Sequence, residues 1–195
     1  MDIRNIYEAL ANKGKILSKS EILEVIREYS KKFRKINAEN TIKYLSRHNY
    51  TKRIFLEFYY INSYDEKKQK ICKYEDKELL FLVLDKLKIK WYLGLNSAFY
   101  TQGKTWQTPN LLNIINNKLS GYKKILGLNI RFFKIKDNLI FGLKKAETKN
   151  KVPYFYSDPA KTYLDKVYFR QTKNLIRIKN TNNYLKRYPK WVGKK

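Results

Sequence analysis

The chain has 195 residues, 43% of them hydrophobic, and carries 43 Lys and Arg against 17 Asp and Glu, a formal net charge of +26 at pH 7. This length suits one large domain or two small ones, and the apolar content is enough to form a core. A surplus of this size favours a polyanionic partner, with nucleic acid expected first and an anionic membrane surface second. One cysteine, Cys72, and one histidine, His48, exclude an intramolecular disulfide and a structural zinc site made of Cys and His.

The positive charge is spread unevenly along the chain. Residues 1–60 hold 13 Lys and Arg against 7 Asp and Glu, so a surplus of 20 lies beyond residue 60. Either a second positive surface exists there, or a lysine-rich composition makes the whole chain basic. The longest strongly apolar stretch, Leu79–Leu84, is far shorter than the roughly 20 residues that span a bilayer. The N-terminus carries acids and lacks the apolar run of a signal peptide, which predicts a cytoplasmic protein with no membrane partner.

Two amphipathic helices are predicted at the start of the chain. The first lies within residues 1–14 and places four apolar side chains on one face, Ile3, Ile6, Tyr7 and Leu10. The second starts at Ser18, because Ser18 and Glu21 have the spacing of a capping box. Its buried stripe is expected to consist of Ile22, Val25, Ile26 and Tyr29.

A third helix is predicted to start at Asn37, a favourable N-cap residue. Ala38, Ile42 and Leu45 would then face the core. The opposite face presents amide, basic and aromatic side chains, namely Asn40, Lys43, Tyr44, Arg47 and His48. These side chains suit the major groove of duplex DNA, because amides and Arg read base edges while Lys and Tyr hold phosphates.

A hairpin is expected after this helix. Residues 54–60 alternate like a strand, residues 62–68 form a polar turn, and a return strand is expected near Ile71. Three short helices followed by a hairpin are typical of a winged helix-turn-helix domain, with Lys52 and Arg53 where the hairpin meets the DNA backbone. A plain α+β domain with a solvated basic face is the alternative.

The rest of the chain has a mixed pattern. A helix over residues 76–87 joins the halves, and no Pro/Gly/Ser-rich linker separates them. Further strands are predicted at 90–93, 112–117, 128–135, 139–143 and 152–156, and further helices at 95–102, 157–170 and 183–188. We therefore predict an α+β protein with a winged helix at 1–60, a wing and connector at 61–87, and a mixed α/β domain at 88–195.

The sequence offers little for catalysis. It contains no phosphate-binding glycine motif, and the acids beyond Leu87 are few: Asp137, Glu147, Asp158 and Asp165. A metal-dependent nuclease or nucleotidyltransferase would need two or three clustered acids. Asp158 is better explained as a helix cap before Pro159, and Asp165 as a partner of Lys161 at i,i+4 or as a buried helix acid. We expect no enzymatic activity, no metal and no cofactor.

Aromatic residues are abundant, with 17 Tyr, 10 Phe and 3 Trp. Where they alternate with Lys and Arg, as in residues 131–134 and 151–156, they either fill a core or stack on single-stranded bases. An RNA-binding protein that uses its basic, aromatic C-terminal half is therefore the alternative function.

Segments of the second half resemble AbiEi-type antitoxins. Residues 95–103, LNSAFYTQG, resemble the family's "SAL…HG" helix, with Gln102 where the family often has His. Residues 154–165, YFYSDPAKTYLD, resemble its "DPEKTLLD" strand-to-helix segment, and residues 185–189 resemble its terminal helix. The matching positions of the central motif are Asp158, Pro159, Lys161, Thr162 and Asp165.

The resemblance implies a sequence-specific transcriptional regulator that acts as the antitoxin of a type IV toxin–antitoxin, or abortive-infection, system. Its winged helix would repress its own operon by binding a double-stranded DNA operator, and its partner toxin would be a nucleotidyltransferase. The family supplies no catalytic residues.

Overall fold

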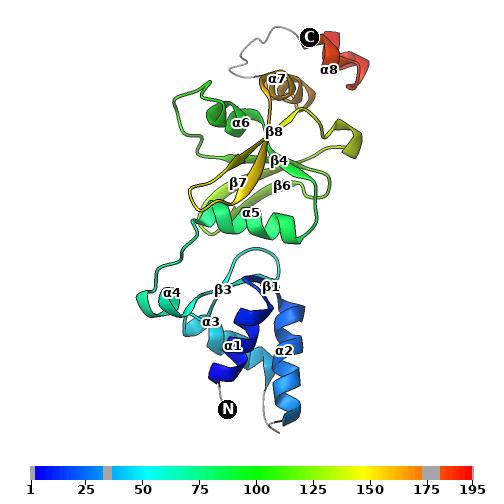
Figure 1. The fold of residues 1–195 in the computed structure, drawn as a ribbon. Helices are drawn as coiled ribbons and strands as arrows, with labels where there is room; N and C mark the ends of the chain where they lie inside the picture. Colours follow the sequence, from blue (N-terminus) through cyan, green and yellow to red (C-terminus); the bar gives the residue numbers. More distant parts are fainter. Residues whose placement is uncertain (1–2, 33–36, 173–180, 195) are drawn as a thin grey trace. The chain divides into compact units, whose positions relative to one another are not determined.

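The computed structural model describes residues 3–32, 37–172 and 181–194 (Figure 1). It is a mixed α+β protein, which confirms the predicted fold class at this level. The chain divides into two compact units, residues 1–86 and residues 87–195. None of the described helices is both long and apolar enough to cross a membrane.

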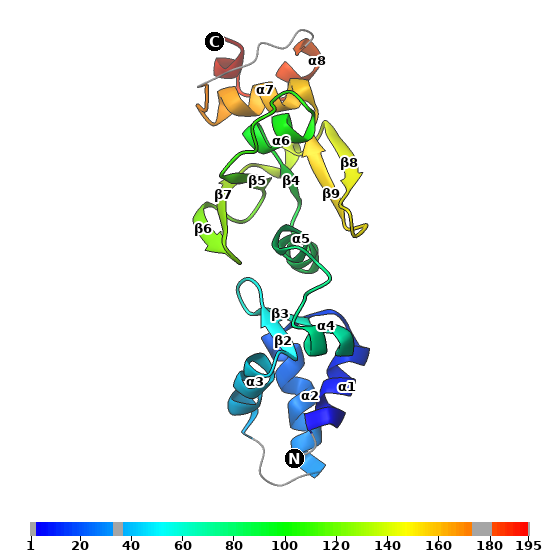
Figure 2. The same ribbon diagram turned by 90° about the vertical axis from the view of Figure 1, so that its left-hand side faces the viewer.

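The N-terminal unit combines helices with a small sheet (Figure 2). Its elements are α1 (Ile3–Lys13), β1 (Ile16–Ser18), α2 (Lys19–Lys32), α3 (Ala38–Arg47), β2 (Thr51–Arg53), β3 (Phe58–Ile61), α4 (Tyr64–Gln69) and α5 (Asp76–Lys86). The strand β3 lies between β1 and β2 and is antiparallel to both. The three predicted helices are confirmed, but β1 was not predicted.

The capping box that starts α2 is confirmed. The Ser18 amide donates to the Glu21 carboxylate at 2.7 Å, and the Glu21 amide donates to the Ser18 hydroxyl at 3.2 Å. The apolar faces of the helices meet in one core with side chains from the sheet. Its most deeply buried members are Ile6, Leu10, Leu17, Ile22, Ile26 and Leu45.

The predicted course of the hairpin is wrong in two places. Residues 54–60 do not form one strand, because the chain turns back between β2 and β3. The turn is held by the Arg53 guanidinium, which donates to the Leu56 carbonyl at 3.1 and 3.2 Å, while Leu56 adopts a left-handed conformation with φ of 52°. No return strand forms near Ile71, whose side chain is 65% exposed. The predicted polar turn instead contains the helix α4, which Ser63 caps.

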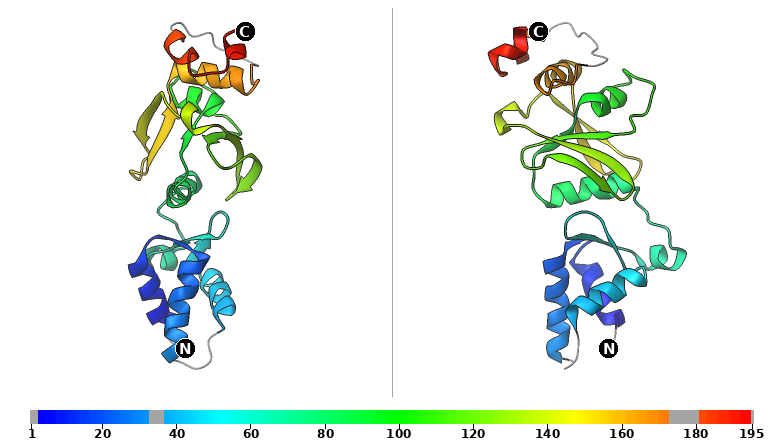
Figure 3. Two further views of the ribbon diagram at one scale, coloured as in Figure 1. Left: turned by 90° about the vertical axis from the view of Figure 1, so that its right-hand side faces the viewer. Right: turned by 180° about the vertical axis from the view of Figure 1, so that it is seen from behind.

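The C-terminal unit contains a six-stranded sheet of order β6-β7-β5-β4-β9-β8 (Figure 3). Its elements are β4 (Trp91–Leu93), α6 (Leu95–Thr101), β5 (Leu112–Asn116), β6 (Gly121–Ile125), β7 (Leu128–Lys134), the 3-10 helix η1 (Asp137–Leu139), β8 (Leu143–Glu147), β9 (Pro153–Ser157), α7 (Pro159–Tyr168), α8 (Asn182–Leu185) and the 3-10 helix η2 (Lys190–Lys194). The pairs β4–β9 and β5–β7 are parallel, and the other neighbours are antiparallel.

One predicted strand of this sheet is wrong, and one observed strand was not predicted. A strand was expected at residues 139–143, but residues 137–139 form η1 and the strand β8 begins only at Leu143. The edge strand β6 was not predicted, because four of its five residues are exposed and show no apolar alternation. The helices α6 and α7 pack against each other and against the sheet. Their contribution to the core includes Leu95, Leu164 and Val167, which meet Tyr92 and Ile115 of the sheet.

Candidate functional site

The helix α3 has one buried face and one exposed face. The Asn37 side chain caps its start by accepting the Asn40 amide at 3.1 Å, as the sequence predicted. Thr41, Ile42 and Leu45 are buried, and the last two belong to the core of the N-terminal unit. Because residues three and four apart share one face of a helix, this inner stripe leaves the opposite stripe to solvent.

All five residues predicted to read DNA on α3 and at its C-terminal end are exposed, namely Asn40, Lys43, Tyr44, Arg47 and His48. Residues 40, 43 and 47, and likewise 40, 44 and 48, are three or four apart, so all five lie along one side of the helix. The rings of Tyr44 and His48 are in contact, with centroids 4.1 Å apart. Among the residues that the structure describes, neither Lys43 nor Arg47 forms an ion pair. Both cations are therefore available to an anionic ligand.

The two basic residues predicted on the hairpin already have partners in the protein. The Lys52 ammonium lies 2.8 Å from the Asp76 carboxylate, and both side chains are partly exposed. The Arg53 guanidinium uses two of its N–H groups on the Leu56 carbonyl but remains exposed. Lys52 is thus neutralised locally, whereas Arg53 combines a role in the turn with remaining donors for a phosphate.

A neighbouring cluster of three charged groups partly neutralises two acids beside α3. Glu39 lies in the first turn of the helix, and the Lys19 ammonium is 3.0 Å from its carboxylate and 4.0 Å from that of Glu57. The two acids thus share one cation, and Lys43 and Arg47, which have no ion pair among the described residues, add positive charge on this side. Lys19 was not predicted, because its partners are 20 and 38 residues away in the sequence.

The residues that resemble the antitoxin motif lie at the junction of β9 and α7. Asp158 caps α7, because its carboxylate accepts the Lys161 amide at 2.8 Å and also the Tyr184 hydroxyl at 2.7 Å. Pro159 occupies the first turn, as predicted. The Thr162 hydroxyl is 2.7 Å from the buried Ser157 hydroxyl, and the Gln102 amide donates to Thr162 at 2.9 Å. Gln102 therefore ties α6 to this junction.

Lys161 and Asp165 form a fully buried ion pair one helical turn apart on α7. The Lys161 ammonium also donates to the hydroxyls of Tyr92 at 2.9 Å and Tyr188 at 2.6 Å. These hydroxyls in turn donate to Asp165 at 2.9 and 2.6 Å. Each of the three N–H groups of the Lys161 ammonium thus has one acceptor, so none of its donors is left unsatisfied. The sequence predicted the i,i+4 partnership but not the two tyrosines.

Burial sets the proton affinities in this network. It lowers the pKa of the Lys161 ammonium, although the Asp165 carboxylate opposes that effect. It likewise raises the pKa of Asp165, against the opposing charge of Lys161 and the hydrogen bonds from Tyr188 and Tyr92. The pKa of both tyrosines is raised by burial and by Asp165. These contacts favour a role in fixing α7 to β4 and to the segment that carries Tyr188.

In comparisons with known proteins, this chain matches no family model and no curated protein sequence. Among the described residues, no group of three or more His, Cys, Asp and Glu side chains is arranged to hold a metal ion.

Replacing Asp158 by alanine tests the structural role of the motif. The change removes the N-cap acceptor of α7 and the partner of the Tyr184 hydroxyl, so we expect a loss of about 1–2 kcal/mol in the free energy of unfolding. Ser157 cannot replace the cap, because its buried hydroxyl is engaged with Thr162. Asp158→Asn keeps an acceptor and should lose less in urea unfolding. A stably folded Asp158→Ala variant that has lost a metal-dependent activity would instead identify a catalytic carboxylate.

Proposed function

We propose that this protein is a sequence-specific DNA-binding transcriptional regulator whose helix α3 enters the major groove of a duplex operator. The proposal depends chiefly on the two faces of α3. One face is anchored in the core, and the other exposes Asn40, Lys43, Tyr44 and Arg47 in one row. Asn and Arg side chains make bidentate contacts with adenine and guanine edges, and Lys and Tyr contact phosphates.

The order of elements in the N-terminal unit supports a winged helix. Helix, strand, two helices and a hairpin follow one another from α1 to β3, and β3 lies between the other two strands. In a winged helix the second and third helices form the helix-turn-helix, and the hairpin is the wing. Here α2 and α3 would take the first role and β2–β3 the second, with Arg53 on the DNA side of the wing.

The resemblance of residues 95–103 and 154–165 to AbiEi-type antitoxins supports the second part of the proposal. The protein would repress its own operon and counter a nucleotidyltransferase toxin, by binding and without a cofactor or catalysis. A nucleotidyltransferase gene beside this one, with toxicity that co-expression of this protein relieves, would support that role. A harmless neighbour or unrelieved toxicity would leave a DNA-binding regulator without antitoxin function.

Replacing Arg47 by alanine tests the DNA-binding proposal. Arg47 is exposed and makes no ion pair among the described residues, so its loss should hardly change the melting temperature. If it reads a base, the variant should bind duplex operator DNA about 1–3 kcal/mol more weakly. Fluorescence anisotropy with upstream duplex DNA measures the change.

Lys68→Ala on α4 is the matched control, because it removes one exposed positive charge from the same unit but from a helix other than α3. It should change duplex affinity much less than Arg47→Ala. Unchanged affinity in a Lys43→Ala/Arg47→Ala double variant would refute the assignment of α3 as the recognition helix.

A further inference from the structure

Most of the net charge belongs to the C-terminal unit, not to the unit that carries α3. Residues 87–195 hold 24 Lys and Arg against 4 Asp and Glu, whereas residues 1–86 hold 19 against 13. Three of the four acids have internal partners: Asp137 lies 3.3 Å from Lys90, Asp158 accepts Tyr184, and Asp165 is buried with Lys161. Little negative charge is left to balance the surface lysines, which gives this unit a positive field of its own.

Two hollows that share two lining residues lie beside the strands β5, β7 and β6 of this unit. The first, of about 450 Å³, lies between α6, the loop after it and β7, and is lined largely by polar side chains, among them Asn96, Gln107, Asn110, Asn113 and Arg131. The second, of about 480 Å³, shares Asn110 and Leu111 with the first and continues past Tyr122, Lys123 and Lys124 of the edge strand β6. We call the two hollows together the β6 groove.

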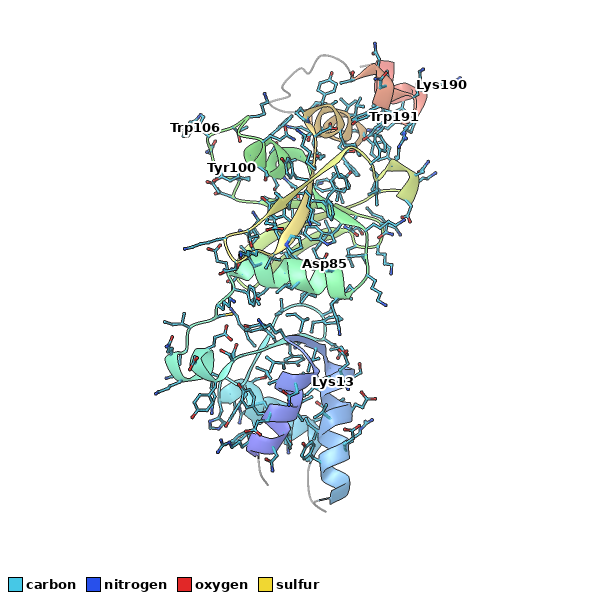
Figure 4. All side chains as sticks on the ribbon, in the orientation of Figure 1. Lys13, Asp85, Tyr100, Trp106, Lys190 and Trp191 are labelled. Carbon is cyan, nitrogen blue, oxygen red and sulfur yellow. The ribbon has the colours of Figure 1, made fainter. Side chains whose placement is uncertain are left out.

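One exposed aromatic ring lines the β6 groove, and a second belongs to the loop that lines it. Trp106 is 94% exposed, and its neighbours Thr105 and Gln107 both line the first hollow. Figure 4 shows its side chain on the loop after α6, directed away from the sheet. Tyr122 is 63% exposed, and the Arg131 guanidinium lies 4.7 Å from its ring centroid and 4.5 Å from that of Phe133. This stacking holds the Tyr122 ring and a positive charge side by side.

We propose that the β6 groove binds single-stranded nucleic acid. Bases would stack on Trp106 and Tyr122, while Lys123, Lys124 and Arg131 hold backbone phosphates. Aromatic rings beside a positively charged groove are the usual platform for single strands, because every base has a π face. The amides in the first hollow supply donors and acceptors for base edges. A duplex fits less well, because its bases are already stacked on one another and do not reach Trp106.

The groove is less suited to a protein partner. Its lining includes three cations, Lys123, Lys124 and Arg131, whereas the centre of a protein interface is usually depleted of charge. The proposal is independent of α3, since every residue named for it belongs to the C-terminal unit. It assigns a site to the basic, aromatic half of the chain.

Binding of a labelled oligouridylate of about 12 nucleotides to the full chain, measured by fluorescence anisotropy, tests the stacking. Trp106→Ala should weaken binding about 5- to 100-fold, as expected for the loss of one stacked base. Tyr64→Ala is the control, because Tyr64 is a 68% exposed aromatic residue of the other unit and should leave the affinity unchanged. The same length of oligothymidylate distinguishes RNA from DNA as the preferred strand.

A second pair of variants tests the charges. Lys123→Gln/Lys124→Gln removes two exposed cations from β6, and Lys144→Gln/Lys145→Gln removes two from β8 at the opposite edge of the same sheet. The first variant should reduce the slope of log K against log salt by about 1.4, and the second should not. A Lys43→Ala/Arg47→Ala variant should keep its affinity for the single strand, which separates this site from α3. Equal effects of the two lysine pairs, or full affinity in Trp106→Ala, would refute the site and indicate general attraction to polyanions.

Discussion

An Asp165→Asn variant is expected to lower the free energy of unfolding of the C-terminal unit by about 3–5 kcal/mol. Both charges of the Lys161–Asp165 pair are fully buried. The substitution leaves the ammonium among the rings of Tyr92, Tyr188 and Phe141, 5.0–5.2 Å from their centroids, without its buried partner carboxylate. Thermal unfolding followed by circular dichroism should show a melting temperature lower by 10 °C or more, at about 4 °C for each kcal/mol.

Asp137→Asn is the matched control for this prediction. It breaks a second Lys–Asp pair of the same unit, but there Lys90 and Asp137 are 65% and 56% exposed. Solvent screens such a pair, so the loss should stay within about 1 kcal/mol. A Lys161→Met/Asp165→Leu double variant removes both charges together and should be more stable than Asp165→Asn. An Asp165→Asn variant as stable as the parent would show that the pair is not held in the dry environment seen here.

The helices of the N-terminal unit are predictable because their signals are local. The capping box of Ser18 and Glu21 and the N-cap Asn37 act within three residues, and apolar side chains recur every three or four. The strand β1 is different. Its three residues pair with β3, about 40 residues later, and the sequence of residues 16–18 does not by itself indicate that partner.

The hairpin departs from its predicted course for a related reason. The alternation of apolar residues continues from Ile54 to Tyr60 straight through the turn, so the pattern resembles one longer strand. Turns of this kind usually contain Gly or Asn, which tolerate a positive φ. Here Leu56 takes that conformation, and the Arg53 guanidinium holds its carbonyl. The side-chain contact replaces the usual sequence signal.

The candidate sites likewise differ in whether nearby residues in the sequence are enough to predict them. The exposed row on α3 follows from helical spacing, and the i,i+4 pair of Lys161 and Asp165 does too. Tyr92 and Tyr188 complete that pair from 69 and 27 residues away from Lys161, so only the fold brings them there. The β6 groove likewise joins the loop after α6 to β6 and β7, and the exposure of Trp106 cannot be inferred from its neighbours in sequence.

The affinity of the full chain for duplex DNA is expected to fall more steeply with salt than that of residues 1–86. Each neutralised phosphate contributes about 0.9 to the slope of log K against log salt. Residues 87–195 carry 20 more basic than acidic residues, against 6 more in residues 1–86. If four of these extra cations contact phosphates, raising salt from 50 to 200 mM should weaken the full chain about 100-fold more than the fragment.

The fragment contains the whole core formed by residues between Ile3 and Ile61, although the buried apolar side chains of its last helix, α5, lie outside that core. Circular dichroism should first show that its helices are retained. The slopes are then measured by anisotropy with one operator duplex over the same salt range.

A steeper slope for the full chain means that the C-terminal charge contacts the operator beside α3. Equal slopes mean that this charge does not touch duplex DNA, because a bound cation would release counterions. In that case the surplus of positive charge on residues 87–195 is available to a different polyanion. Single-stranded nucleic acid, proposed above for the β6 groove, is such a polyanion, and its unpaired bases can stack on Trp106.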